Sequence, residues 1–287
     1  MGFPGRHLFK PKATFSLEDL TLKTEQTWIC CAGATLHAEL CVPDIVPAPA
    51  LLICHGMNAK GSQGLRIYAR LAESACNQGF VCLVFDFRGV GQSSGTFDYG
   101  LGEREDVKCA LDYLSSRPEV RPNGIFVVGH SLGGAVSLYA LRNETRVKGL
   151  ALWSTPKDHD YNVRKFIRRT RGRLRLCTFL ILSRLDRLVN IQRLFKLEVY
   201  GVKLRPRHVR EKLMKLNECE AASKLHIPLF IAIGANDDIV GTDEAQAIYE
   251  SANEPKTLRV IEGTDHIYKG KEQELIDKTI EWIKKWV

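Results

Sequence analysis

Ser131 lies at the centre of a Gly-x-Ser-x-Gly pattern that runs from Gly129 to Gly133. The apolar run Gly124–Val128 precedes this pattern, and a segment of helical character begins at Leu132. Between a strand and a helix, such a pattern forms a sharp turn that exposes the serine hydroxyl as a nucleophile, and the glycines leave room where the two elements approach. Nucleophilic attack by Ser131 is therefore the first chemistry to consider, and the alternative is a turn that only packs a helix onto a strand.

A serine hydroxyl is a weak nucleophile unless a base and an orienting acid assist it. Two carboxylates, Asp237 and Asp238, follow the apolar run Pro228–Ile233, and His266 follows the next run, Thr257–Ile261. Turns of this kind have their partners in the chain order serine, acid, histidine. His266 is therefore the candidate base, and either Asp237 or Asp238 is the candidate acid.

Two hydrophobic patterns indicate the elements that hold these residues. Alternating residues at Leu17–Leu22 and Thr35–Val42 predict antiparallel strands, with a turn at Ala32–Ala34. Apolar runs without alternation predict strands buried on both faces, as in a parallel sheet. These runs are Ala50–Cys54, Phe80–Phe85, Gly124–Val128, Val147–Trp153, Pro228–Ile233 and Thr257–Ile261.

Amphipathic segments of helical length alternate with the apolar runs. They are Leu65–Gln78, Glu103–Ser116, Leu132–Leu141, Asp243–Ala252 and Lys271–Val287. This alternation predicts a doubly wound α/β fold.

The alternation is interrupted over Lys157–Lys215, where the sequence is helix-like and rich in arginine. Apolar spacings of three and four predict one or two amphipathic helices within Leu174–Val199, and a further helix over Arg207–Leu216. We therefore expect a core formed by residues 1–155 and 218–287, with an insertion of residues 156–217 at the carboxyl edge of the sheet.

The interrupting segment also holds the excess positive charge of a chain whose net charge is +8, since it carries 18 Lys and Arg against 5 Asp and Glu. The charge is either a solvated surface, or an attraction for an anionic substrate or an anionic membrane surface. Nucleic acid is not expected as a partner, because no nucleic-acid motif is present and the aromatic residues have spacings suited to core packing.

Several of these motifs together resemble the α/β-hydrolases of the esterase, lipase and serine-peptidase group, from about Thr35 to the C-terminus. The matching motifs are His55-Gly56-Met57, Asp86–Ser93, Gly129–Gly134, Gly234–Asp237 and Gly263–His266. The resemblance implies an α/β-hydrolase fold: a mostly parallel central sheet with antiparallel N-terminal strands, helices on both faces, and a helical cap made by the insertion.

The same resemblance implies roles for single residues. The Gly-x-x-Asp pattern of the family falls on Asp237 and not on Asp238. The implied catalytic triad is Ser131, Asp237 and His266, and the implied oxyanion hole consists of the backbone N–H groups of Met57 and Leu132. Asp86 and Arg88 correspond to a structural loop, for which we expect a turn-stabilising ion pair.

As a function, the resemblance implies hydrolysis of carboxylic esters with short to medium acyl or aryl groups, through an acyl-enzyme and without a cofactor. Monoacylglycerol lipase or thioesterase activity on lipid or anionic substrates is an alternative, and a catalytically idle scaffold that binds a ligand is another. An aminopeptidase would need an acidic anchor for the substrate amine, which a basic cap does not supply.

The cysteines, the nucleotide-binding motifs and the lengths of the apolar stretches bear on cofactors and on cellular location. The nine cysteines are scattered, without Cys-x-x-Cys or Cys/His metal spacing, and predict buried unpaired thiols in a reducing compartment. No Walker loop or Gly-x-Gly-x-x-Gly turn is present, so neither a metal nor a nucleotide cofactor is expected. The sequence shows no signal peptide and no stretch of about 20 apolar residues, which predicts a cytoplasmic protein.

Overall fold

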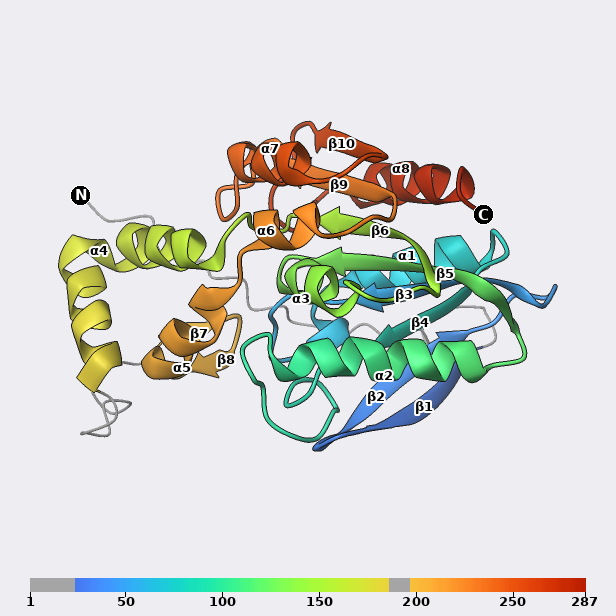
Figure 1. Ribbon diagram of the computed structural model, residues 1–287, viewed down its shortest axis with the longest axis horizontal. Coiled ribbons are helices and arrows are strands. Elements are labelled where there is room, and N and C mark those ends of the chain that lie inside the picture. The colour runs from blue at the N-terminus through green and yellow to red at the C-terminus, as the bar shows by residue number, and fades with distance from the viewer. Residues whose placement is uncertain (1–23, 186–196) are drawn as a thin grey trace.

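The computed structural model describes residues 24–185 and 197–287, and for a few positions in this range, 169–176 among them, the backbone alone. Eight strands form one sheet in the order β1-β2-β4-β3-β5-β6-β9-β10 (Figure 1). The strands are β1 Thr24–Cys31, β2 Ala34–Cys41, β3 Ala48–Cys54, β4 Val81–Phe85, β5 Val120–His130, β6 Val147–Trp153, β9 Leu229–Gly234 and β10 Lys256–Ile261. β2 pairs antiparallel with β1 and β4, and the other pairs are parallel.

The six runs without alternation coincide with β3, β4, β5, β6, β9 and β10 to within a few residues. Every residue of β3, β4 and β9 is buried, which is why these strands lack an alternating pattern. The predicted fold class is confirmed. The turn predicted at Ala32–Ala34 is confirmed between two antiparallel strands, but the partner of β2 is Thr24–Cys31, and the strand predicted at Leu17–Leu22 lies outside the described residues.

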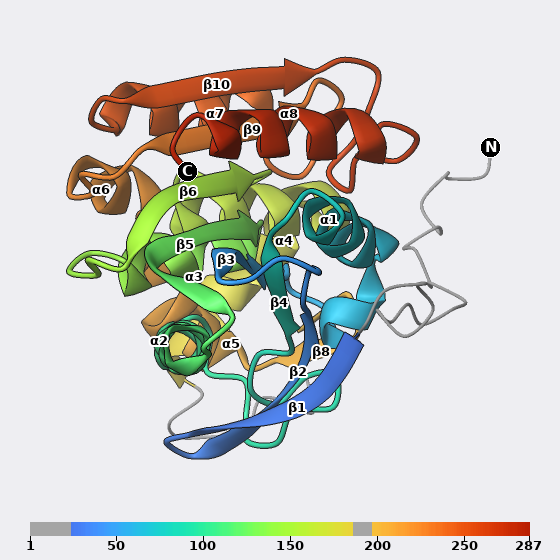
Figure 2. The same ribbon diagram turned by 90° about the vertical axis from the view of Figure 1, so that its right-hand side faces the viewer.

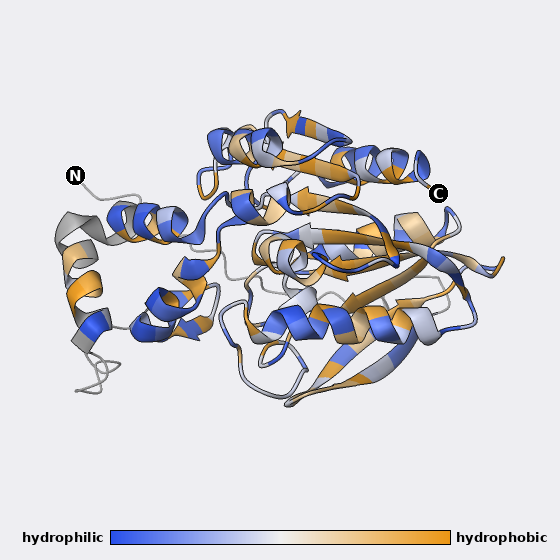
Figure 3. Ribbon diagram, in the orientation of Figure 1, coloured by the Kyte–Doolittle hydropathy of each residue, from blue (hydrophilic) through white to orange (hydrophobic). Residues whose placement is uncertain are grey.

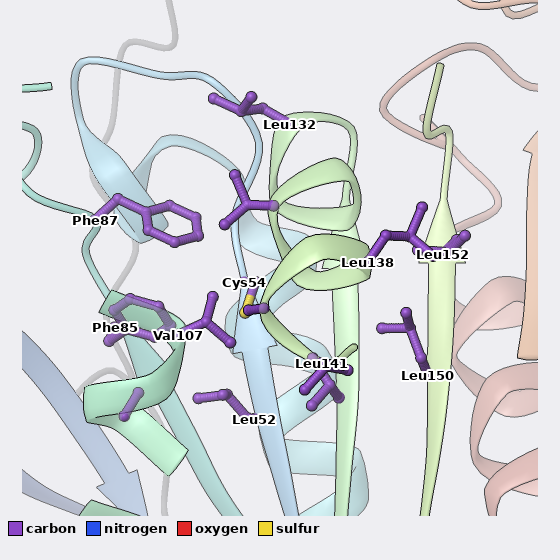
Figure 4. Close-up of a cluster of buried hydrophobic side chains, with 14 of the residues drawn as sticks. Leu52, Cys54, Phe85, Phe87, Val107, Leu132, Leu138, Leu141, Leu150 and Leu152 are labelled. Carbon is purple, nitrogen blue, oxygen red and sulfur yellow. The ribbon is translucent and has the colours of Figure 1, made fainter. Parts of the chain in front are cut away.

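Helices cover both faces of the sheet (Figure 2). The helices α1 Arg66–Cys76 and α8 Glu272–Lys284 contribute to one hydrophobic core, and α2 Gly102–Ser116, α3 Leu132–Ala140 and α7 Thr242–Ser251 contribute to the other. The central strands consist mostly of hydrophobic residues, while the helices have polar outer faces (Figure 3). Figure 4 shows part of the second core, where Leu52 and Val107 lie on one side of α3 and Leu138 lies next to Leu152 of β6 on the other. The two layers hold the carboxyl ends of the parallel strands in fixed positions.

The segment between β6 and β9 contains both helices and strands. It consists of α4 His159–Leu185, β7 Leu197–Val199, β8 Val202–Leu204, α5 Pro206–Glu211, a 3-10 turn at Leu213–Lys215 and α6 Glu218–Ser223. The helix predicted up to Val199 is wrong at its end, because β7 and β8 form a hairpin with Tyr200 and Gly201, both at positive φ, at its turn. The helix predicted over Arg207–Leu216 is broken at Lys212. We call residues 156–217 the inserted segment.

The two ends of the inserted segment lie side by side. Asp158 and Asn217 form an antiparallel bridge. The His159 N–H donates to the Leu216 carbonyl, and the Glu218 N–H donates to the Lys157 carbonyl, each at 3.0 Å. The inserted segment therefore joins the core through a paired neck formed by residues 157–159 and 216–218.

Four cysteines form two disulfides, so the expectation of unpaired thiols is wrong for them. Cys31 on β1 bonds to Cys109 on α2, and Cys41 on β2 bonds to Cys76 on α1, with Cα–Cα distances of 5.9 and 6.4 Å. Residues far apart in sequence are brought together by the packing of β1 and β2 against the helices, which a cysteine count does not reveal. In the described ranges, no helix has the length and apolar character needed to cross a membrane.

Half of the arginines in the inserted segment, from which an anionic-surface contact was expected, fall outside the described side chains. These are Arg169, Arg171, Arg173, Arg175, Arg187 and Arg193. A contact with an anionic substrate or membrane surface therefore stays a prediction, as do the compartment and the domain boundaries.

Candidate active site

Ser131 occupies a strained turn between β5 and α3. Its φ of 52° and ψ of −117° lie outside the regions that residues with side chains usually adopt. Its N–H donates to the carbonyl of Trp153 on β6 at 2.7 Å, which ties the turn to the sheet. A Cβ on Gly133 would overlap the carbonyl oxygens of Cys54 and His55 on the neighbouring strand. The glycines therefore allow the close approach that lifts the Ser131 hydroxyl above the sheet edge.

The structure brings Ser131, His266 and Asp237 into one hydrogen-bonded chain. His266 Nε2 lies 3.2 Å from Ser131 Oγ, and His266 Nδ1 lies 2.8 Å from Asp237 Oδ2. An ionised carboxylate only accepts hydrogen bonds, so the Nδ1–H donates to Asp237 and Nε2 is free to accept the serine proton. This arrangement matches the geometry of a serine, base and acid triad.

Asp237 is the carboxylate that faces His266. Its Oδ1 accepts hydrogen bonds from the N–H groups of Ile239 and Val240, each at 3.0 Å, which fixes the carboxylate plane. Burial alone would raise the pKa of Asp237, but the charge and hydrogen bond of His266 and the Val240 N–H hold it below its ordinary value. Asp238, the alternative left open by the sequence, is exposed.

Met57 and Leu132 lie on either side of Ser131 in the wall of one pocket. Leu132 is the first residue of α3, so its N–H has no acceptor within the helix. Within the described residues, neither its N–H nor that of Met57 donates to another protein group. Both N–H groups are therefore available to bind a developing oxyanion.

A buried network connects the three loops that carry these groups. The Gly56 N–H donates to the Tyr68 hydroxyl at 3.0 Å, and the Tyr68 hydroxyl lies 2.7 Å from His130 Nδ1. On its other side, His130 Nε2 lies 3.0 Å from the carbonyl oxygen of His266. Because that carbonyl only accepts, Nε2 carries the proton and Nδ1 accepts from Tyr68. Tyr68 thereby links the residues next to Met57, Ser131 and His266.

Burial keeps His130 and His55 neutral. It lowers the pKa of His130 to about 3, with the nearby His266 as the second cause, and it also lowers the pKa of His55. His55 Nε2 accepts a hydrogen bond from the Phe87 N–H at 3.0 Å, which again requires a neutral ring. These two histidines hold backbone groups in place.

Asp86 and Arg88 do not pair with each other, which corrects the expected ion pair. Arg88 binds Asp106 on α2, with Nη2 2.6 Å from Oδ1. Asp86 accepts hydrogen bonds from the Ser62 N–H and hydroxyl, each at 2.7 Å, and from the Gln92 N–H at 2.9 Å. Asp106 therefore holds Arg88 against α2, while Asp86 joins the backbone at Ser62 to the backbone at Gln92.

The pocket above Ser131 is apolar, and the inserted segment supplies much of its wall. The lining includes Leu65, Val163, Phe166, Ile167, Val209 and Leu213. Three of these belong to α4 and two to the segment that follows the hairpin. A wall of this kind excludes water and accepts the apolar part of a substrate.

Sequence reasoning missed the polar residues that surround the triad. Tyr68 lies within an ordinary amphipathic helix, and His159 and Glu218 lie almost 60 residues apart at the neck. No local motif marks any of them, since their contacts depend on how α1 and the inserted segment pack. His130 alone carried a signal, because it lies inside the serine motif.

The protein combines an α/β sheet with a serine on a strained turn after β5, an acid after β9 and a histidine after β10. This combination defines an α/β-hydrolase. The family model described as "Serine aminopeptidase, S33" matches residues 46–270, and the chain belongs to that family.

Curated relatives are similar over parts of their length. The quorum-quenching protein AidA of Acinetobacter baumannii is 33% identical over 36% of this chain and 34% of its own length. An uncharacterized protein of Mycobacterium tuberculosis is 28% identical over 76% of this chain and 63% of its own length. The chain thus spans less than two thirds of either relative.

Solved structures show the same fold across nearly the whole chain. Est1E of Butyrivibrio proteoclasticus, solved with bound ferulic acid, has a TM-score of 0.69 and 22% identity, covering 91% of this chain and 98% of its own. An esterase of Pyrococcus furiosus has a TM-score of 0.71 and 20% identity, covering 95% and 94%.

Proposed function

We propose that this protein hydrolyses carboxylic esters with short to medium acyl or aryl groups. The observation that carries the proposal is the chain Ser131–His266–Asp237 at the floor of an apolar pocket. The esterases among its structural neighbours support the same reaction class by analogy of fold.

The reaction proceeds in two halves. His266 Nε2 takes the Ser131 proton while Oγ attacks the ester carbonyl, and the Met57 and Leu132 N–H groups bind the oxyanion. The imidazolium, held by Asp237, gives its proton to the leaving alcohol as the C–O bond breaks. Water then loses a proton to His266, attacks the acyl-enzyme and releases the acid, and the returned proton restores Ser131.

The pocket favours an ester over a peptide with a free amino terminus, the substrate in the name of the matching family. No Asp or Glu is among the described residues that line it, so an ammonium group would meet no carboxylate there. A buried ammonium without a partner is strongly disfavoured. An apolar acyl group meets Val163, Phe166 and Ile167 instead.

The test is a rate profile over p-nitrophenyl esters of increasing acyl length, with thioester and anilide substrates of the same acyl groups alongside. Ser131→Ala serves as the blank, and we expect its kcat to be lower by about four to six orders of magnitude with unchanged circular dichroism. Labelling by a fluorophosphonate probe should occur on wild type and vanish in Ser131→Ala.

Near-normal ester turnover by Ser131→Ala would overturn the assigned nucleophile. Folded wild type that neither takes the probe nor turns over any ester would instead support a scaffold that only binds a ligand. Faster cleavage of the anilides than of the matched esters would favour the peptidase reaction.

A further inference from the structure

Hydrogen-bond partners account for nearly all the polar side chains in the pocket wall apart from the triad. Tyr68 and His130 belong to the buried network. Asn58 accepts from the Lys60 N–H, and Asn162 donates to the Ile239 carbonyl. Within the described part of the chain, the Tyr200 hydroxyl and His159 Nε2 have no protein partner, and neither do the second amide atoms of Asn58 and Asn162.

Of these residues, His159 is the one held by another side chain, since Asn58 and Asn162 bind backbone groups. It is the first residue of α4, is 6% exposed, and places Nδ1 2.7 Å from Glu218 Oε1. The Glu218 side chain is fully buried, and its other oxygen, Oε2, has no hydrogen-bond partner among the described residues. Its single side-chain hydrogen bond therefore comes from His159, and this bond fixes the imidazole ring.

The pairing decides what His159 offers to the pocket. Because the carboxylate only accepts, Nδ1 is the donor to Glu218, and Nε2 is the remaining ring nitrogen. Nε2 has no protein partner among the described residues and keeps some accessible surface in the wall of the pocket, where such polar atoms bind and orient a ligand. The geometry therefore points to a polar atom of the substrate as the partner of Nε2.

We propose that His159, oriented by Glu218, binds a hydroxyl group of the substrate, so that the pocket prefers hydroxylated esters over apolar esters of the same size. The proposal rests on the ester hydrolysis proposed above. A hydroxyl fits this site because it donates to a neutral Nε2 and accepts from a protonated one. A carboxylate fits less well, since Glu218 already places a negative charge beside the ring.

A purely structural role for the pair makes a different prediction. His159 and Glu218 also lie in the neck, where their backbone N–H groups bind Leu216 and Lys157. If the two side chains only stabilised the neck, their removal would lower kcat/KM by the same factor for every ester. The ratio of kcat/KM between a hydroxylated and a methyl-terminated ester of equal length separates the two roles.

Two variants of His159 divide its functions. In His159→Asn the amide nitrogen takes the place of Nδ1 and keeps the donor to Glu218, while the Nε2 position is empty. In His159→Gln the amide nitrogen takes the place of Nε2 and keeps a polar group in the pocket. We expect wild type to prefer the hydroxylated ester by about three- to tenfold, which corresponds to one net hydrogen bond.

We expect His159→Asn to lose this preference with its melting temperature nearly unchanged, and His159→Gln to retain part of it. Matched ester pairs with the hydroxyl in the acyl group form one arm and pairs with the hydroxyl in the alcohol form the other, which tells where the group binds. The absence of any preference in both arms of wild type, or an equal preference in His159→Asn, would overturn the proposal. Fluorophosphonate labelling of Ser131 separates this failure from a failure of the proposed function.

Discussion

The Tyr68 hydroxyl on α1 lies 2.7 Å from His130 Nδ1, one residue before the candidate nucleophile. His130 Nε2 donates a hydrogen bond to the carbonyl oxygen of His266. At the other end of the network, the Gly56 N–H donates to the Tyr68 hydroxyl. A single phenol thereby fixes the relative positions of the three loops on which the proposed reaction depends.

Removal of that phenol in Tyr68→Phe leaves the Gly56 N–H without an acceptor and His130 Nδ1 without a donor. Because small misplacements of reacting groups slow catalysis strongly, we expect kcat to fall about tenfold or more with a smaller change in KM. Steady-state kinetics on p-nitrophenyl acetate, which is too small to fill the pocket, measures this. Tyr113→Phe is the matched control, because Tyr113 is half-buried on α2 and does not line the pocket, and equal kcat values in the two variants would contradict the positioning role.

The depressed pKa of His130 predicts a dependence of stability on pH. The group titrates near 6.5 when unfolded and at about 3 when folded, so between these values the unfolded state binds more protons. Stability is therefore lost as pH falls below about 6.5, by roughly 2 to 3 kcal/mol at pH 4.5. Between pH 7.5 and 4.5, the free energy of unfolding in urea should fall less in His130→Gln than in wild type, by this amount. Equal losses in the two proteins would refute the assigned effect of His130.

The two adjacent carboxylates provide a direct test of the acid. Asp237→Asn replaces the acceptor of the His266 Nδ1–H and favours the wrong tautomer, so we expect kcat to fall by about 10³ to 10⁴. Asp238→Asn changes an exposed neighbour and should leave kcat within about twofold. Similar losses in both variants would move the assignment away from Asp237.

Asp86 should matter for stability more than for chemistry. In Asp86→Ala the Ser62 N–H, the Ser62 hydroxyl and the Gln92 N–H lose a buried acceptor, at about 1 to 3 kcal/mol for each unsatisfied group. We expect a loss of about 3 kcal/mol or more in denaturant unfolding. Asp160→Ala, which removes an exposed ion pair to Arg164, should change stability by less than about 1 kcal/mol. Comparable values for the two would show that the Asp86 bonds contribute little.

The sequence predicted the parts of the fold that local patterns encode. Buried strands such as Val147–Trp153 appear as apolar runs because both of their faces are covered, and Ser131 was recognisable because a strained turn needs glycines around it. The chain order serine, acid, histidine indicated His266 and one of Asp237 and Asp238 as partners of Ser131, and the resemblance to the α/β-hydrolases selected Asp237.

Features that depend on packing between distant segments were not predictable in this way. The β7–β8 hairpin occurs where apolar spacing suggested a helix, and Tyr200 and Gly201 adopt the left-handed conformations that a two-residue hairpin turn needs. The contacts Cys31–Cys109, Tyr68–His130 and His159–Glu218 join residues 78, 62 and 59 positions apart. Their pairing is decided by the docking of helices on the sheet, which no local periodicity reports.

The paired neck has an evolutionary consequence. Since the inserted segment leaves and re-enters the core at hydrogen-bonded neighbours, a segment of another length or sequence could replace it without altering the order of the sheet strands. The catalytic floor would be inherited unchanged, while the roof of the pocket diversified. His159 and Glu218 lie at this junction, so a replacement made between them would keep the pair and its proposed preference for hydroxylated esters, and a replacement that includes them would remove both.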